Sequence, residues 1–132
     1  MKITYRALKR AGACSEQLEE FKQRFGSSVD VTEEACVAVS SAFDWDWAAG
    51  NLLKSSARKV FEDAREIAAV AYEDARAIAR TVAVTWKEYE DARAIAEKVY
   101  DDTMALAFAR AYNSQNLLND LGARSIKFLR IR

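Results

Sequence analysis

The sequence predicts an all-α protein in which an N-terminal cluster of short helices precedes a long, alanine-rich helix of coiled-coil character or a helical hairpin. The first supporting observation is that the 132 residues contain no proline and only four glycines, so helix breakers are rare. The second is that the chain from Asn51 to Leu121 contains neither residue type. The third is an octapeptide that recurs within this stretch at nearly helical spacing.

The first 53 residues are divided by glycines and polar segments into short predicted helices. Residues 3–11 predict the first helix, with Gly12 at its C-terminal end. Ser15 is expected to be the N-cap of a second helix, which ends at Gly26. We therefore treat residues 1–53 as a small helical domain.

Thr32 and Asp44 are the predicted N-caps of a third and a fourth helix, because a side-chain oxygen at that position accepts a free backbone N–H. The fourth helix is expected over Trp45–Leu53, where apolar residues recur with the helical period. The short helices are expected to pack around a shared set of large apolar side chains, namely Leu8, Leu18, Phe21, Phe25, Val39, Phe43, Trp45 and Leu52.

Residues 54–121 form the predicted long helical region and contain the repeated octapeptide. It reads FEDAREIA from Phe61, YEDARAIA from Tyr72 and again from Tyr89, and a partial copy starts at Tyr100. The offsets between the copies are 11, 17 and 11 residues. Because eleven residues are close to three helical turns, the aromatic residue returns to nearly the same face of the helix.

Apolar residues also form a seam from Phe61 to Leu106 at alternating steps of three and four residues, the pattern of coiled-coil packing. Many of them are alanine, which allows two helices to approach closely. Three acid–base pairs at i,i+3 spacing support the same helical period, namely Glu62 with Arg65, Glu73 with Arg76, and Glu90 with Arg93.

The irregular offset of 17 residues leaves two arrangements open. A hairpin turn would fall in Ala83–Glu88, but this segment lacks Gly, Pro, Asn and Asp, the usual turn residues. We therefore expect one continuous helix of about 70 Å in preference to a hairpin. A turn in the asparagine-containing residues 111–119 would give a bundle instead. The basic C-terminal tail comprises residues 122–132, and two interpretations are open for its segment Ser125–Arg132, a short strand or a segment that depends on a partner.

The charge distribution argues against a strong general attraction to nucleic acid or to membranes, because 20 basic and 20 acidic residues leave no net charge. The middle of the sequence is acidic and both ends are basic, so weak nucleic-acid binding through the termini remains an alternative function. The apolar runs are far shorter than the roughly 20 residues needed to span a bilayer. We expect an intracellular protein without a membrane partner.

The side chains that most enzymes use are missing. There is no histidine, the commonest general base and metal ligand, and there is no glycine-rich phosphate loop or serine-nucleophile motif. Cys14 and Cys36 are expected to be buried thiols in a reducing cytoplasm. The repeated Glu-Asp pairs point about 100° apart on a helix, so they do not predict a metal site. We predict a protein that is not an enzyme and binds no cofactor.

The candidate interface residues are aromatic, small or charged. Trp45 is expected mainly in the core, whereas Trp47 suits the core and an interface equally well. The tyrosines are expected beside the seam with their hydroxyl groups in water. The full candidate set is Trp45, Trp47, Tyr72, Tyr89, Tyr100, Ala75, Ala92, Glu73, Asp74, Glu90, Asp91, Lys127, Arg130 and Arg132.

Several of these motifs occur together in a pattern that resembles a known group of proteins. The pattern comprises Gly12-Ala-Cys14, Gln17, Phe21 and Phe25, then Phe43-Asp-Trp-Asp-Trp-Ala-Ala49, the YEDARAIA repeats and Ala107-Phe-Ala-Arg-Ala-Tyr112. It resembles small uncharacterised proteins of tailed bacteriophages and prophages over about the first 115 residues. The resemblance implies a phage-encoded protein in the bacterial host cytoplasm, with an accessory role such as inhibition of a host defence protein of the anti-CRISPR type.

The leading functional hypothesis is a non-enzymatic protein–protein interaction module that binds through its long helix and its N-terminal helical domain. It is motivated by a sustained apolar seam without a reactive centre. A structural or assembly coiled coil of a phage particle, which would form homo-oligomers, is one alternative. A weak nucleic-acid binder that uses the basic termini is another.

Overall fold

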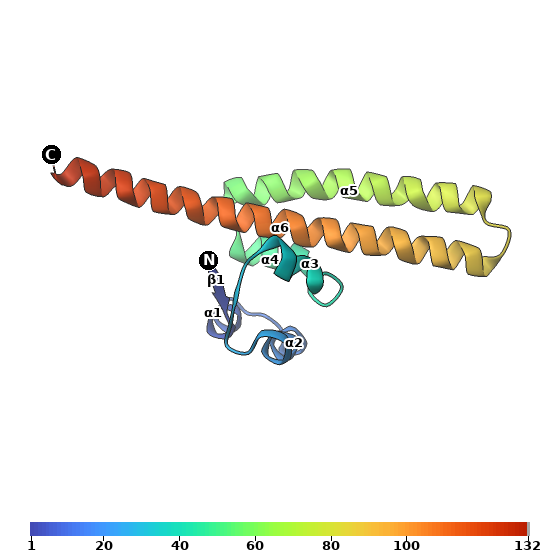
Figure 1. The fold of residues 1–132 in the computed structure, drawn as a ribbon, viewed down its shortest axis with the longest axis horizontal. Helices are drawn as coiled ribbons and strands as arrows, with labels where there is room; N and C mark the ends of the chain where they lie inside the picture. The colour runs from blue at the N-terminus through green and yellow to red at the C-terminus, as the bar shows by residue number, and fades with distance from the viewer. Residues whose placement is uncertain (132) are drawn as a thin grey trace.

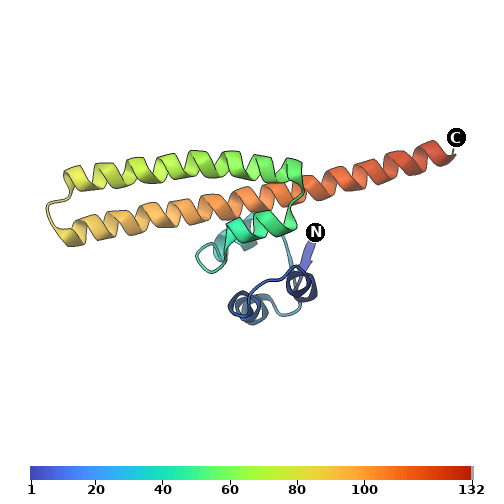
Figure 2. The same ribbon diagram turned by 180° about the vertical axis from the view of Figure 1, so that it is seen from behind.

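The computed structural model describes the backbone of residues 1–131 and the side chains of residues 1–117. It confirms the all-α prediction, because helices make up most of the described chain and only a small two-stranded sheet accompanies them there. Two long antiparallel helices form a rod, and a cluster of short helices packs beside the open end of this hairpin (Figures 1 and 2).

A short antiparallel sheet ties the N-terminus to the segment that follows the second helix. Strand β1 (Lys2–Thr4) pairs with β2 (Ser28–Asp30), and Ile3 lies opposite Val29. The helix predicted from residue 3 therefore begins later, at Tyr5. The N-terminal residues are extended because β2 offers them backbone hydrogen bonds, and such pairing between distant segments leaves little trace in the local pattern.

The first two helices are α1 (Tyr5–Arg10) and α2 (Ser15–Phe25). Gly12 follows α1 as predicted and has a φ of +93°, in the left-handed region that favours glycine. The prediction that Ser15 is the N-cap of α2 is wrong by one residue. Ser15 is already helical, and Cys14 occupies the N-cap position without a side-chain hydrogen bond.

The predicted caps of the next two helices are confirmed. Helix α3 (Glu33–Ala38) follows Thr32, and α4 (Trp45–Leu52) follows Asp44. Each cap side chain accepts a hydrogen bond of 3.0 Å from the backbone N–H three residues later. Such a cap satisfies one of the free N–H groups of the first turn and typically contributes about 1 kcal/mol.

The expectation of one continuous long helix is wrong, and the hairpin alternative is correct. Helix α5 (Ser55–Val82) and helix α6 (Trp86–Ile131) run antiparallel and are joined by a three-residue connection. Two polar side chains, Thr85 in the connection and Glu88 in the first turn of α6, make the turn. Thr85 Oγ1 accepts from Glu88 N at 3.1 Å, and Glu88 Oε2 accepts from Val84 N at 2.8 Å. This arrangement is close to a capping box, which needs neither glycine nor asparagine.

The hairpin also explains the irregular spacing of the octapeptide. The offset of 17 residues exceeds the regular 11 by six residues, which is the length of the turn segment Ala83–Glu88. The first two copies lie on α5, and the later two lie on α6. Tyr72 of α5 consequently meets Tyr100 of α6, with ring centroids 5.9 Å apart.

Helix α6 continues through residues 111–119 and into the C-terminal tail, so neither the turn nor the short strand that the sequence left open is formed there. Asn113, one of the residues that suggested a break, and its neighbour Gln115 bind the N-terminal cluster instead. Asn113 Nδ2 donates to the Val31 carbonyl oxygen at 2.9 Å, and Gln115 Nε2 donates to the Leu52 carbonyl oxygen at 3.2 Å. These contacts fix the height at which the cluster sits along α6.

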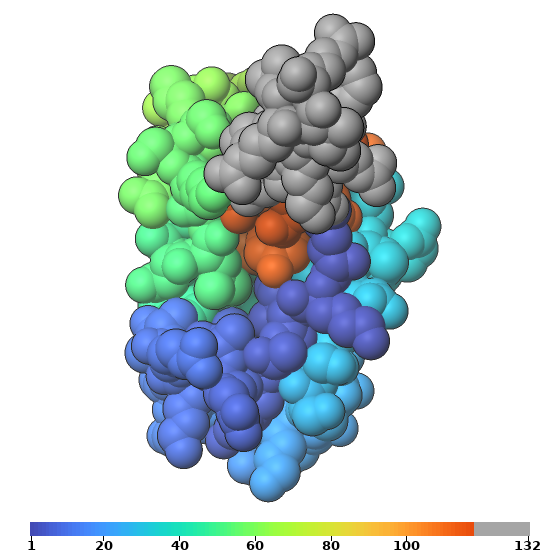
Figure 3. All heavy atoms as spheres, turned by 90° about the vertical axis from the view of Figure 1, so that its left-hand side faces the viewer, coloured from blue at the N-terminus to red at the C-terminus, as the bar shows by residue number. Residues whose placement is uncertain are grey.

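The apolar core lies where the short helices meet the open end of the hairpin. Phe61 of α5 and Phe108 of α6 are completely buried there. The end-on view shows the N-terminal segment, in blue and cyan, against α5 in green and α6 in orange (Figure 3). Of the predicted core residues, Leu8, Leu18, Phe21 and Val39 are buried, and Phe25, Phe43, Trp45 and Leu52 are half-buried.

Candidate interaction surface

An open groove runs along the hairpin between α5 and α6. Its lining consists of Ala68, Ala71, Tyr72, Ala75, Ile78, Ala79 and Val82 from α5, and Ala92, Ile95, Ala96, Val99, Tyr100 and Thr103 from α6. Within the described part of the chain, no charged side chain lines this groove. Among the described lining residues, the polar side-chain groups are the hydroxyl groups of one threonine and two tyrosines.

Large aliphatic side chains stand at the edges of the groove and remain in contact with water. Ile78 and Val82 of α5 are 61% and 70% exposed, and Ile95 of α6 is 68% exposed. The floor between them is made of alanines, including the interface candidates Ala75 and Ala92. Ridges of large residues beside a floor of small residues are the surface features that allow another pair of helices to interdigitate.

The predicted seam is therefore only partly a contact between α5 and α6. Phe61 and Ala68 are buried as expected, but Ile78, Val82 and Val99 are exposed. The reason is that a two-helix layer covers only one stripe of each helix. An eleven-residue repeat gives α5 a wider apolar face than a single neighbour can cover.

The exposed apolar stripe of α5 extends beyond the groove toward the start of the helix. Val60 and Ile67 are also mostly exposed, and helical spacing places them in line with Ile78 and Val82. From Val60 to Val82 the helix rises about 33 Å, and two packed helices present a face about 20 Å wide. The two-helix face that carries the stripe therefore has an outline of about 650 Å².

The tip of the hairpin carries a second exposed patch, which combines aromatic and basic side chains. Val84 and Trp86 are 89% and 75% exposed. Trp86 packs on Tyr89 with ring centroids 5.4 Å apart, and the Arg80 guanidinium lies 6.0 Å from the Tyr89 ring. Hydrogen bonding to Arg76 and then to Arg80 lowers the pKa of the Tyr89 phenol. The arginines and aromatic rings of the tip thus form one connected cluster.

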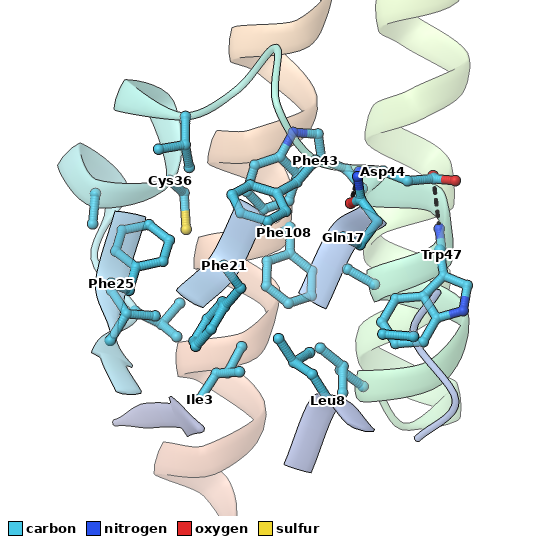
Figure 4. Close-up of a pocket in the computed structure, with 18 of the residues that line it drawn as sticks. Ile3, Leu8, Gln17, Phe21, Phe25, Cys36, Phe43, Asp44, Trp47 and Phe108 are labelled. Carbon is cyan, nitrogen blue, oxygen red and sulfur yellow. Dashed lines mark hydrogen bonds between the residues drawn. The ribbon is translucent and has the colours of Figure 1, made fainter. Parts of the chain in front are cut away.

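Both tryptophans of the Phe43–Trp47 segment point into the interior of the N-terminal cluster rather than outward. They line an apolar cavity of about 80 Å³ together with Phe21 and Phe108 (Figure 4). Trp45 also donates a hydrogen bond from Nε1 to a backbone carbonyl at 2.9 Å. The cavity is about half the size of one that admits benzene, roughly 150 Å³, so it is better described as imperfect packing than as a ligand site.

The remaining tyrosine candidates lie between the helices of the hairpin. Tyr72 and Tyr100 are half-buried and contact each other, and the Arg76 guanidinium lies 5.7 Å from the Tyr72 ring. Their position beside the groove agrees with the expected packing next to a seam. They support the hairpin and also form part of the groove wall.

The acidic candidates are surface residues of ordinary kind. Glu73 and Glu90 form the predicted ion pairs with the arginines three residues later, at 3.2 Å and 3.0 Å. Asp74 and Asp91 are exposed. Because exposed pairs contribute at most about 1 kcal/mol, these residues do not by themselves define a site.

The third predicted ion pair, between Glu62 and Arg65, does not form. Arg65 Nη1 pairs instead with Asp46 Oδ1 of α4 at 3.0 Å and so joins the cluster to the hairpin. The three basic candidates of the C-terminal tail are Lys127, Arg130 and Arg132. They lie outside the residues whose side chains the structure describes.

One cluster of reactive side-chain types lies between the loop after α3 and helix α6. Ser40 Oγ donates to Asp102 Oδ1 at 2.5 Å, and Lys98 Nζ donates to the same oxygen at 2.5 Å. A serine nucleophile needs an accessible hydroxyl and a neutral base. Ser40 is only 3% exposed and Lys98 is ion-paired, so the arrangement serves as a tether.

The two cysteines lie in different surroundings. Cys36 is buried as predicted, whereas Cys14 is exposed, which corrects the expectation of two buried thiols. Cys14 is exposed because it stands at the start of α2 rather than on its inner face.

Among the described residues, no group of three or more potential ligands is placed to hold a metal ion. None of the described helices combines the length and apolar character needed to cross a membrane.

Sequence reasoning did not single out Trp86 at the hairpin tip, or Val60 and Ile67 on the exposed stripe of α5. A signal for the tip was present in Thr85 and Glu88, whose spacing matches a capping box. A signal for the stripe was present in Val60, Ala71 and Val82, which share the eleven-residue repeat.

Comparison of the chain with models of protein families, with curated proteins and with solved structures finds no match.

Proposed function

We propose that this protein is a non-enzymatic protein–protein interaction module that binds through its α5–α6 hairpin. The observation that carries the proposal is the uncharged apolar groove with exposed Ile78, Val82 and Ile95 at its edges. Burial of apolar surface stabilises an association by about 25 cal/mol per Å², so a face of this kind favours contact with another macromolecule.

The hairpin offers two surfaces with different characters. The groove provides area without charge, whereas the tip provides Trp86, Tyr89 and Arg80, residue types that dominate the energetics of many interfaces. A target protein that engages the tip would gain an aromatic anchor and a cation. We therefore assign recognition of a target to the tip.

The resemblance to small phage and prophage proteins directs this proposal toward a host protein in the bacterial cytoplasm. A component of a host defence system, bound and blocked in the manner of an anti-CRISPR inhibitor, is the first target to seek. A structural role as a self-assembling helical component of a phage particle is the second candidate. The uncharged groove, with its alanine floor, favours this second candidate.

The test is capture of partners from bacterial lysate on the tagged full-length chain, followed by affinity measurement with each purified partner. Trp86→Ala should weaken binding about 30-fold, since the loss of an aromatic anchor costs 2 kcal/mol or more. The matched control is Leu117→Ala, another exposed apolar residue far from the tip. A chain that neither captures a partner nor self-associates would contradict the proposal, as would a partner whose binding is insensitive to both surfaces.

A further inference from the structure

We propose that the groove binds a second copy of this chain, which forms an antiparallel four-helix bundle from two hairpins. The inference rests on the proposed function, since both treat the hairpin as a contact surface. Of the two surfaces of the hairpin, the groove and the tip, the groove is the one whose occupant is named here. In this arrangement α5 packs on α5 of the other copy and α6 on α6. Three observations favour a second copy over an unrelated partner.

The first observation is that the exposed stripe of α5 is complementary to itself when reversed about Ala71. Val60 then lies opposite Val82 of the other copy. Ala64 lies opposite Ile78, and Ala75 lies opposite Ile67, so that a small residue faces a large one in both cases. A two-fold interface requires this reciprocity, because each residue must fit its counterpart in both directions.

The second observation is that α6 has the same property about Val99. On reversal, Ala92 lies opposite Leu106 and Ile95 lies opposite Thr103. The two centres lie within about 3 Å of the same height along the hairpin, because each is one residue away from Tyr72 or Tyr100, whose rings are in contact at 5.9 Å. One two-fold axis can therefore pass through both centres.

The third observation concerns charge and area. A charged face repels its own copy, but the described lining of the groove carries no charge, so two identical faces can meet without that cost. Two faces of about 650 Å² bury about 1,300 Å² in total, within the range of roughly 1,200–2,000 Å² for specific stable interfaces. The tips then point to opposite ends and remain free for a target.

The first experiment measures molar mass by light scattering over a concentration series of the full chain. The wild-type protein should show twice the monomer mass of 14.8 kDa. Ile78→Glu and Val99→Glu, at exposed groove positions, should each return it to the monomer with unchanged circular dichroism. Val70→Glu is the matched control, because Val70 is 62% exposed on α5 and does not line the groove. A wild-type monomer, or a dimer that survives both groove variants, would overturn the inference.

The second experiment tests the orientation of the two copies in a Cys14→Ser background. Val99→Cys places a thiol on the proposed axis and should form an intermolecular disulfide within the dimer. Val84→Cys places it at the tip, and the two tips would stand about 40 Å apart, so it should not cross-link. Cross-linking through position 84 and not through position 99 would rule out the antiparallel arrangement. Capture of a host target by a monomeric wild-type chain would refute the dimer and leave the proposed function standing.

Discussion

Cys14 and Cys36 have the same side chain in different surroundings, and those surroundings decide their chemistry. Cys36 is buried in the core, and burial raises the pKa of its thiol to about 11. Cys14 is exposed at the start of α2. Because the thiolate is the reactive form, the two thiols should differ strongly in reactivity.

We expect one thiol of the native protein to react rapidly with a thiol reagent such as dithionitrobenzoate at pH 8. Cys14→Ser should remove the fast reaction, and Cys36 should react only after the protein is denatured. Counting the released chromophore in the native and denatured states measures this directly. Rapid reaction of two thiols in the native state would show that the region around Cys36 opens readily.

Asp102 is held by hydrogen bonds from Lys98 and Ser40, and these two partners lower the pKa of its carboxyl group. The folded pKa is therefore below the unfolded value of about 3.9. The resulting stabilisation is fully present above pH 4 and is lost as the pH falls through the folded pKa.

Asp102→Asn should therefore lower the free energy of unfolding near neutral pH, and the difference from wild type should shrink as the pH falls below 4. Urea denaturation at pH 7 and pH 3 measures the two differences. Asp91→Asn, at an exposed position, is the control and should show no such change. A difference that is independent of pH would remove the assigned role of the ionised carboxylate.

At the scale of elements, the connection between α5 and α6 depends on a few polar contacts. Thr85 satisfies the free backbone N–H of Glu88 in the first turn of α6, and the Glu88 side chain satisfies the N–H of Val84 in the connection. Arg58 serves the other end of α5, where its guanidinium donates to the carbonyl oxygens of Gly50 and Leu53 at 3.0 Å and 3.1 Å. These contacts set both corners at which the chain changes direction.

Thr85→Ala should destabilise the protein by about 1 kcal/mol, the usual cost of losing an N-cap side chain, and lower the melting temperature by about 4 °C. Amide hydrogen exchange should accelerate around the tip before it changes elsewhere. Thr81→Ala, a change of the same kind in the last turn of α5, should have a much smaller effect because alanine favours the helix. Equal effects of the two changes would mean that the cap does not hold the turn.

At the scale of the whole molecule, the short helices and the hairpin share one core. Phe108 of α6 lies 5.6 Å from Trp45 of α4 and 5.7 Å from Tyr112, measured between ring centroids. The ion pair of Arg65 with Asp46 crosses the same junction. The end of the hairpin near its tip lacks this support and depends on the contact between its own two helices, which is why an added pair of helices would stabilise it.

Phe108→Ala should cost about 3–5 kcal/mol, since it removes a fully buried ring from this junction. Against a typical stability of about 5–15 kcal/mol, the loss should be evident in thermal unfolding. Fluorescence of the tryptophans and circular dichroism of the helices should report one shared transition. The control Leu117→Ala, at an exposed position, should change the free energy of unfolding by less than about 0.5 kcal/mol. Separate transitions in the wild type would indicate that the short helices and the hairpin fold independently.

The sequence by itself determined the features that depend on neighbouring residues. The helical class, the caps at Thr32 and Asp44, and the glycine after α1 all follow from interactions within a few positions along the chain. The ion pairs of Glu73 and Glu90 with the arginines one turn later belong to the same class. Such contacts join residues that are close in the chain, so a pattern can reveal them, although a distant partner can replace one, as Asp46 replaces Glu62 at Arg65.

Only the tertiary structure decided the features that depend on distant residues. Three features are of this kind: β1 pairs with β2, Arg65 pairs with Asp46 rather than with Glu62, and the chain reverses at residues 83–85. In each case the local sequence allows two arrangements of similar free energy. Packing of the two helices against each other and against Phe108 selects one of the two arrangements. The same packing leaves Ile78 and Val82 in water, because two helices cannot cover an apolar face that wide, and so it creates the surface on which the proposed function rests.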